Sequence, residues 1–128
     1  NFALTNLINQ AKNKKIKILK LSDTKDVYRG YMDSEELIKW IFKILMSSNK
    51  RFNIYNVGSD EAITIENLAK LIGKKFNKTI FKHKRKNIKD VDYYVPSILK
   101  VKKELNLKIN FKIKRSLNKL LRDINKKN

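Results

Sequence analysis

The sequence predicts an α/β fold that combines a small mixed sheet with about five helices. Three observations indicate this class. Apolar residues recur at helical spacing in several segments, shorter segments rich in Ile, Phe and Val lie between them, and no repeat or low-complexity linker interrupts this order. The chain has 128 residues, of which 41% are hydrophobic and 34% are charged. These values are typical of one globular domain with a modest core.

A helix and a strand are expected first. Residues 2–12 carry four apolar residues at helical spacing: Leu4, Leu7, Ile8 and Ala11. Residues 15–21 alternate isoleucine with lysine, which predicts a strand with one face toward solvent. The polar residues 22–26 predict a loop.

The stretch 28–37 predicts a short strand that runs into a helix. Asp33 is a good N-cap residue, and Glu36 three positions later predicts a capping-box-like pair. The helix carries apolar residues on more than one stripe: Leu37, Ile38, Trp40, Ile41, Ile44 and Leu45. Such a wide apolar face predicts burial, for example against a sheet. Residues 47–49 are expected to end this helix.

The middle of the chain predicts a strand over residues 51–57 and a turn at Gly58 and Ser59. Thr64 is the expected N-cap of a helix over residues 65–76.

The residue before that cap, Ile63, is expected to pack on Leu68 as a hydrophobic staple. A further strand is predicted over residues 79–84.

Two helices are expected near the C-terminal end. Pro96 and Ser97 open a helix over about residues 98–105, and residues 109–113 predict a short strand or an extended arm. Ser116 is the expected cap of a last helix, whose apolar residues are Leu117, Leu120, Leu121 and Ile124.

The net charge of +19 favours polyanionic partners, nucleic acid first among them. A basic module that binds nucleic acid without catalysis is therefore one alternative function. The lysines, however, are spread over every predicted element, and the abundance of Lys, Asn and Ile is typical of an AT-rich genome. The densest basic run, 82–86, lacks interleaved aromatic residues, and no recognition helix or RNA-binding motif is present. We therefore expect only weak, non-specific binding to nucleic acid.

Few residues suit catalysis or metal binding. The chain has no cysteine, and a surface position is expected for its one histidine, His83. The carboxylate pairs Asp60 with Glu61 and Asp90 with Asp92 lack His or Cys neighbours, so loop or cap roles are expected rather than a metal site. No glycine-rich phosphate loop is present. The residues alone thus predict no catalytic residue, no metal and no cofactor bound by this chain.

No signal peptide and no apolar run of about 18 residues is visible, so no membrane span is expected and the cytoplasm is the default location. The chain begins at Asn1 rather than at Met, which favours a piece of a longer protein.

Five segments in order resemble the C-terminal, substrate-binding half of the extended short-chain dehydrogenase/reductases, the NAD-dependent nucleotide-sugar epimerases and dehydratases. They read FALTNLINQA, KIKIL, YRGYMDSEELIKWIFKIL, FNIYNVGSDEAITIENLAKLI and DYYVPSILKVKKELNL. The resemblance implies that residues 1–128 form a single C-terminal portion of a Rossmann-type nucleotide-sugar enzyme. The N-terminal half, with the glycine-rich NAD(P) loop and the Tyr-x-x-x-Lys catalytic pair, is absent from this chain.

The family's site residues can be placed on this sequence one at a time. Asn6, followed by Leu7, falls where the family contacts the nucleotide diphosphate. Backbone groups that line the base fall at Ile18 and Leu19. Arg29 falls on the arginine that binds the diphosphate.

The remaining positions follow the same pattern. Tyr31 falls on the aromatic residue two positions after that arginine, Asp90 falls near a carboxylate that holds the ribose, and Tyr94 falls on an aromatic residue close by. The sequence departs from the pattern in having Gly30 in place of an aspartate after the arginine. Arg85 and Asn87 are both candidates for the arginine that precedes the ribose carboxylate.

The resemblance implies partners as well. They are a nucleotide diphosphate sugar, the absent N-terminal half with its NAD(P), and a second copy in a homodimeric intact enzyme; the chain alone should be inactive. Residues 51–57 and the helix after Asp33 are then expected to present an apolar surface to the absent half. Judged from the residues alone, Arg29 has a competing role, which is to pair only with Asp26 or Glu36 at the surface.

Overall fold

The computed structural model describes residues 3–21, 26–47, 53–82 and 91–126. Contacts between residues divide the chain into two compact units, each built from two separate segments. Unit 1 comprises Asn1–Arg29 and Ile63–Tyr94, and unit 2 comprises Gly30–Ala62 and Val95–Asn128. The described part of the chain contains five helices and five short strands, which confirms the α/β class.

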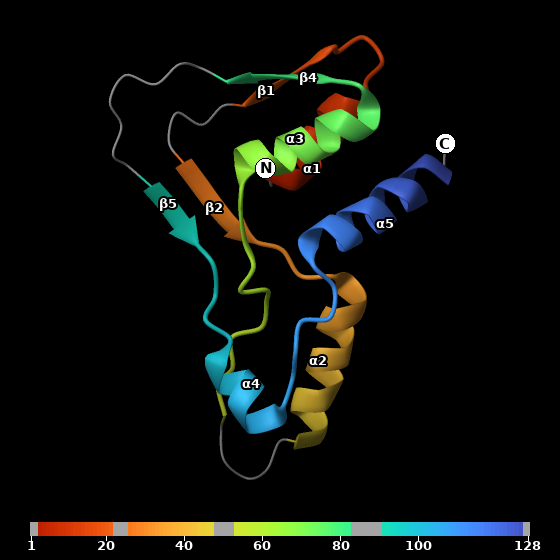
Figure 1. The fold of residues 1–128 in the computed structure, drawn as a ribbon. Helices are drawn as coiled ribbons and strands as arrows, with labels where there is room; N and C mark the ends of the chain where they lie inside the picture. The colour runs from red at the N-terminus through yellow and green to blue at the C-terminus, as the bar shows by residue number, and fades with distance from the viewer. Residues whose placement is uncertain (1–2, 22–25, 48–52, 83–90, 127–128) are drawn as a thin grey trace. The chain divides into compact units, whose positions relative to one another are not determined.

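Unit 1 is a two-helix layer on a parallel strand pair. Strand β1 (Ile18–Leu21) pairs with β4 (Thr79–Lys82), so that Ile18 lies opposite Thr79. Helices α1 (Ala3–Lys12) and α3 (Ile65–Phe76) pack against each other and against this pair (Figure 1). The core contains Leu7, Ile8 and Ala11 of α1, as the helical periodicity predicted, whereas Leu4 is only half-buried. Leu68, Ala69 and Ile72 of α3 complete the core with Leu19 and Leu21 of β1. This strand therefore buries the face opposite to Ile18, which is 44% exposed.

Gly73 lets α3 lie directly on the strands. A Cβ atom at this position would be 2.8 Å from Ile80 Cδ1 and 2.8 Å from the carbonyl oxygen of Lys78. The Ile80 methyl group can move aside, but the Lys78 oxygen belongs to the main chain, so any other residue would push the helix outward. The helix ends one turn later at Asn77, whose φ of 53° is left-handed, and Lys78 N–H donates to Gly73 O at 2.9 Å.

The second sheet has the order β3-β2-β5. Strand β2 (Asp26–Gly30) pairs in parallel with β5 (Val91–Tyr94), and β3 (Ala62–Thr64) lies on the other side of β2. The register places Arg29 beside Tyr94 and Tyr28 beside Tyr93. This strand pair carries the central predicted site residue.

Unit 2 has a core around Trp40. Helices α2 (Ser34–Ser47) and α4 (Leu99–Leu105) pack together, and Trp40, Ile98 and Val101 are its most buried cluster. Helix α5 (Ile113–Lys126) completes the elements of this unit. It buries Leu117 and Leu121.

The start of α2 differs in one respect from the prediction. Asp33 is the N-cap as expected, since its Oδ1 accepts a hydrogen bond from Glu35 N–H at 2.9 Å. Glu36 does not complete a capping box. Glu36 as a whole is 1% exposed, and its carboxylate accepts hydrogen bonds from Asn110 N–H at 2.5 Å, Asn110 Nδ2 at 3.0 Å and Phe111 N–H at 3.3 Å. A buried carboxylate with three donors from a distant segment is more favourable than one local contact, so the long-range partner displaces the box.

The start of α5 corrects a second cap. The helix begins at Ile113, so Ser116 lies inside it and its buried hydroxyl has no hydrogen-bond partner. The Ile113 N–H instead donates to Glu61 Oε2 at 2.9 Å. A carboxylate at a helix N-terminus also opposes the positive end of the helix dipole. The cap role expected for Glu61 is therefore correct.

Two predicted strands are absent from the described residues, and two observed strands, β3 and β5, were not predicted. Residues 53–57 are not a strand in the structure, and residues 109–112, for which a strand or an extended arm was predicted, form no strand either. A segment becomes a strand only by pairing with a neighbour, and a single sequence does not reveal whether that neighbour is present. Strand β5 was not predicted, because Asp92 and the short length of this run are unfavourable signals for a strand.

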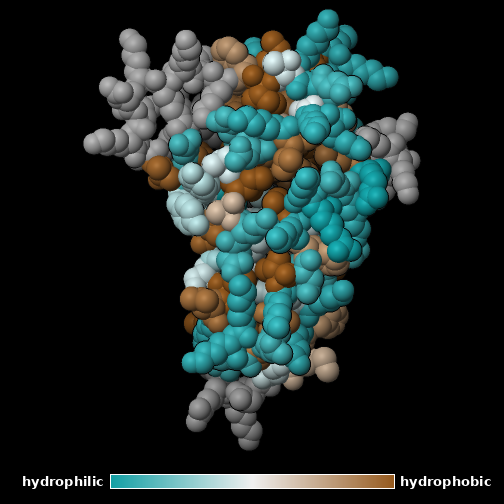
Figure 2. Space-filling model, viewed as in Figure 1, coloured by the Kyte–Doolittle hydropathy of each residue, from teal (hydrophilic) through white to brown (hydrophobic). Residues whose placement is uncertain are grey.

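The wide apolar face of α2 is largely exposed rather than buried. Only Trp40 is fully inside, while six other large residues are between 38% and 85% exposed: Leu37, Ile38, Ile41, Phe42, Leu45 and Met46. Ile54, in the segment 53–57 without helix or strand, is 83% exposed. The expected apolar surface is therefore present on α2, whereas in residues 53–57 only Ile54 contributes, because Tyr55 and Val57 pack against the Trp40 cluster. In Figure 2 hydrophobic residues interrupt the hydrophilic surface at several places. Among the described residues, no helix has the length and apolar character needed to cross a membrane.

Candidate functional site

Arg29 is held by a carboxylate on the neighbouring strand. Its Nη2 donates to Asp92 Oδ2 at 2.8 Å and its Nη1 to Asp92 Oδ1 at 3.2 Å, a two-point ion pair. Nη1 also donates to the carbonyl oxygen of Tyr28 at 2.7 Å. The side chains of Arg29 and Asp92 are 30% and 33% exposed, so the pair is fixed in place yet open to solvent.

The pairing of β2 with β5 sorts the side chains onto two faces. Because side chains alternate along a strand, Arg29, Asp92 and Tyr94 lie on one face, and the Arg29 Cζ atom is 5.9 Å from the centre of the Tyr94 ring. The opposite face carries Tyr28 and Tyr93, whose ring centroids are 5.5 Å apart. Tyr94 is 77% exposed, so this face can receive a ligand that carries both charge and an apolar surface.

The carboxylate that pairs with Arg29 was not anticipated. Glu36, one of the two expected alternatives, is bound to Asn110 and Phe111 instead. Asp92 was missed because β5 itself was missed. A strand over 91–94 in parallel register with β2 would have placed Asp92 next to Arg29.

A second group of predicted residues lies on α1 and β1. Leu7 and Leu19 are buried in the core of unit 1, whereas Ile18 is 44% exposed and Asn6 is exposed. The residue that links the two elements is Gln10, which was not among the predicted site residues. Its Oε1 accepts a hydrogen bond from Lys20 N–H at 2.9 Å.

The Nε2 of Gln10 donates in two directions, to Asn6 Oδ1 at 3.2 Å and to the carbonyl oxygen of Lys20 at 3.4 Å. The helical spacing of Asn6 and Gln10, four residues apart, is the sequence signal that could have indicated the first of these contacts. The contact with Lys20 depends on how α1 packs on β1, which sequence spacing does not reveal.

The remaining predicted residues are Tyr31 and Asp90. Tyr31 is half-buried in unit 2, while Asp90 and His83 lie outside the described residues. Unit 1 thus brings together Arg29 with Tyr94, and Asn6 with the strand of Ile18 and Leu19. No group of three or more His, Cys, Asp or Glu side chains suited to a metal occurs in the described part of the chain.

The fold has a counterpart among solved structures. It is similar to that of RMD. The structure of RMD from Pseudomonas aeruginosa complexed with NADPH matches with a TM-score of 0.71 over 94% of this chain, at 22% sequence identity. No protein-family model and no curated protein matches the sequence.

The match covers 40% of the RMD chain, so the present chain spans about two fifths of the length of that protein. The likeness confirms the α/β fold that the sequence predicted. The arrangement of helices and short strands described above is therefore shared with part of a larger chain whose solved structure contains NADPH.

Proposed function

We propose that this chain is the nucleotide-sugar-binding portion of an NAD(P)-dependent nucleotide-sugar epimerase or dehydratase of the extended short-chain dehydrogenase/reductase family. The observation that carries the proposal is the fold likeness to RMD over 94% of the chain. RMD was solved with NADPH, which supports a nicotinamide cofactor in the protein that contains this chain.

Arg29 is the proposed diphosphate contact. A guanidinium offers paired N–H donors in the geometry of phosphate oxygens, and its charge persists at any physiological pH. The ion pair with Asp92 supports this role, because it holds the long arginine side chain in one rotamer before a ligand arrives. Tyr94 beside it supplies an apolar ring for the sugar or the base.

The other predicted residues are proposed to contact the same ligand. Asn6 and the backbone of Ile18 and Leu19 are proposed to bind the diphosphate and the base. Tyr31 and Asp90 are proposed as further substrate contacts. The nicotinamide cofactor and the catalytic residues are proposed to belong to sequence outside residues 1–128, because this chain has neither a glycine-rich phosphate loop nor a matching Tyr-x-x-x-Lys catalytic segment.

Substitution of Arg29 tests the proposal. In the protein that contains this chain, Arg29→Ala should weaken the binding of UDP-glucose or GDP-mannose by about ten- to a hundredfold, since a charge-assisted hydrogen bond contributes roughly 1.5–3 kcal/mol. Arg29→Lys should recover only part of this loss, because a point charge cannot make the paired contact. Titration calorimetry measures both affinities, and NADPH binding should change little.

The matched control is Arg122→Ala, which removes an exposed arginine from α5 and should leave the affinity unchanged. A purely structural Arg29 gives a different pattern. Its replacement by alanine would then lower the free energy of unfolding by about 1 kcal/mol, discounted for partial exposure, and would leave the affinity as in the Arg122 control. That result, in a folded Arg29→Ala protein, would refute the proposed role.

A further inference from the structure

Gln10 joins the helix of Asn6 to the strand of Ile18 and Leu19, because its amide forms hydrogen bonds with both elements. We propose that Gln10 is a positioning residue that turns the Asn6 side chain into a hydrogen-bond donor toward the nucleotide diphosphate. This inference rests on the proposed function, which makes Asn6 a diphosphate contact.

The first step concerns the Gln10 amide itself. A primary amide has an acceptor end and a donor end of nearly the same shape, so its orientation is decided by its partners. The backbone N–H of Lys20 can only donate, and the atom that faces it at 2.9 Å must therefore be the oxygen Oε1. The orientation of Gln10 is thus set by the main chain of β1.

The second step transfers this orientation to Asn6. With Oε1 turned to Lys20 N–H, the Nε2 of Gln10 has two N–H donors, and two acceptors face it. They are the Lys20 carbonyl oxygen at 3.4 Å and Asn6 Oδ1 at 3.2 Å. Asn6 must present its oxygen to Gln10, because two amide nitrogens would leave both sets of donors unsatisfied.

The third step concerns the ligand. Asn6 is exposed, and because its oxygen is engaged by Gln10, its Nδ2 group is the end of the amide that remains for a ligand. Diphosphate oxygens are acceptors only, so they bind an N–H group and repel a carbonyl oxygen. A surface asparagine free to rotate by 180° would present the wrong end half of the time. The link to Lys20 removes that choice before the ligand binds, which is preorganisation.

The sharpest test reverses the polarity without changing the shape. Gln10→Glu keeps an acceptor for Lys20 N–H but has no donor for Asn6, so the Asn6 amide is expected to rotate and donate to the introduced carboxylate, turning its oxygen outward. In the protein that contains this chain, the affinity for UDP-glucose or GDP-mannose should fall about tenfold or more by titration calorimetry. The control is Asn9→Glu, which places the same charge on the adjacent exposed position of α1 and should cost clearly less affinity.

Two further variants complete the test. Asn6→Asp keeps the acceptor for Gln10 and removes the outward donor, so it should lose as much affinity as Gln10→Glu. Gln10→Met frees the Asn6 amide and should cost only about two- to threefold in affinity. Amide hydrogen exchange adds a readout that needs no ligand: protection of Lys20 N–H should persist in Gln10→Glu and be lost in Gln10→Met.

The failures are distinguishable. If Arg29→Ala weakens binding but Gln10→Glu binds as well as Asn9→Glu, the positioning role is wrong and the proposed function stands. Equal protection of Lys20 N–H in Gln10→Met would likewise overturn the role. If the unmodified protein binds neither sugar nucleotide, the proposed function fails and the donor role of Asn6 fails with it.

Discussion

Arg29 and Asp92 show how much one residue's role depends on its neighbour across the sheet. The two-point geometry fixes both side chains, but about one third of each remains open to water. Solvent screening reduces the contribution of such a pair to stability, whereas its orienting effect on the guanidinium is unaffected. The ion pair therefore orients the Arg29 side chain more than it stabilises the fold.

Tyr55 carries a prediction at the same scale. Its hydroxyl donates to Glu104 Oε2 at 2.8 Å, and this hydrogen bond, aided by the charge of the carboxylate, raises the pKa of Tyr55. Glu104→Gln should lower that pKa toward the ordinary tyrosine value, because the negative acceptor that favours the neutral phenol is lost. Tyrosine ring carbon shifts in an NMR titration would report it.

The sign of the linked stability follows from the direction of this shift. A tyrosine whose folded pKa is raised stabilises the fold at pH below its unfolded pKa and loses that contribution as pH rises through the folded value. Glu104→Gln should therefore lower stability modestly at neutral pH, and its difference from the unmodified protein should shrink as the pH rises through the folded pKa of Tyr55. If the pKa of Tyr55 were the same in Glu104→Gln as in the unmodified protein, the hydrogen bond to Glu104 would be contradicted.

At the scale of the element, two hydroxyl groups predicted as helix caps give opposite expectations. Thr64 Oγ1 accepts a hydrogen bond from Asn67 N–H at 3.1 Å at the start of α3, so Thr64→Ala should lower the free energy of unfolding by about 1 kcal/mol. Ser116 Oγ is buried without a partner, so Ser116→Ala should raise that free energy by up to about 1 kcal/mol. Urea denaturation measures both changes. A loss of stability on Ser116→Ala would show that the hydroxyl is hydrogen-bonded after all.

The helix boundaries explain how far the sequence could predict these elements. The start of α3 is set by residues close in sequence, Thr64 and Asn67, and its predicted range of 65–76 is correct. The start of α5 is set by Glu61, 52 positions away, and its predicted cap was wrong. Local chemistry was predictable, whereas partners brought together by the fold were not. The partners of Asp92 and Gln10 are likewise brought together by the fold, which is why these two contacts were missed.

The exposed face of α2 leads to a prediction about association. Single exposed apolar residues are common on protein surfaces, but six large ones on one helix, with Ile54 nearby in the chain, form a patch that is typical of an interaction surface. We propose that the rest of the protein covers this face, and we expect residues 1–128 expressed alone to self-associate. The double substitution Ile38→Lys and Phe42→Lys should reduce this association without lowering thermal stability.

Sedimentation velocity over a range of protein concentrations would measure the effect. Trp40→Ala is the contrasting variant on the same helix. Because Trp40 is 2% exposed, its removal should cost about 3–5 kcal/mol of stability rather than change association selectively. A monomeric unmodified fragment at high concentration would count against the proposed cover.

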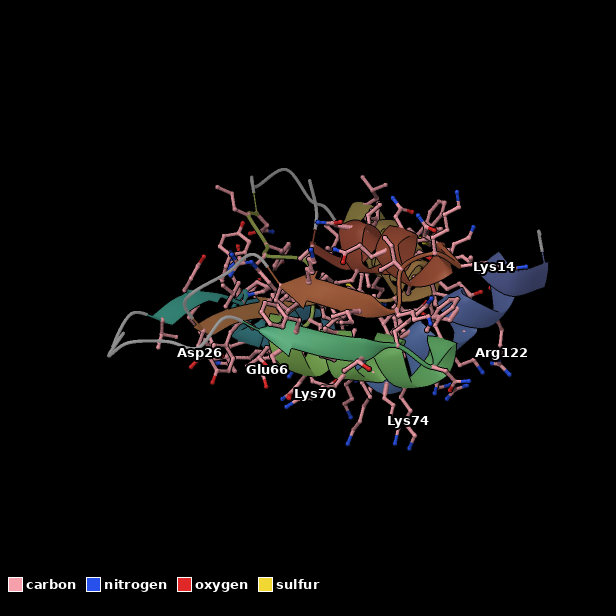
Figure 3. The ribbon with its side chains drawn as sticks, turned by 90° about the horizontal axis from the view of Figure 1, so that it is seen from above. Lys14, Asp26, Glu66, Lys70, Lys74 and Arg122 are labelled. Atoms are coloured by element: carbon pink, nitrogen blue, oxygen red, sulfur yellow. The ribbon has the colours of Figure 1, made fainter. Side chains whose placement is uncertain are left out.

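At the scale of the whole molecule, the charge of +19 is distributed rather than focused. On α3, Glu66, Lys70 and Lys74 lie four residues apart, and Lys70 forms an ion pair with Glu66 at 2.8 Å (Figure 3). Exposed lysines also lie on α1, α2 and α4. Dispersed positive charge attracts polyanions but does not distinguish one nucleotide sequence from another. We expect weak binding to duplex DNA that falls steeply as salt rises from about 50 to 200 mM, with no preference between sequences. Fluorescence anisotropy with two unrelated duplexes would test this, and tight, sequence-selective binding at physiological salt would favour the nucleic-acid alternative.

The Gln10 contact has a consequence for solubility. Thr79 N–H donates to the Lys17 carbonyl at 3.1 Å, so Lys17 faces β4 and Lys20, three residues on, faces the opposite way. Lys20 thus stands on the outer edge of β1, where a strand from another molecule could attach and begin an ordered aggregate. The Gln10 amide occupies both main-chain groups of Lys20 and closes that edge at its centre. A chain without this amide would be exposed to slow fibrillar growth even if its folded state lost almost no stability.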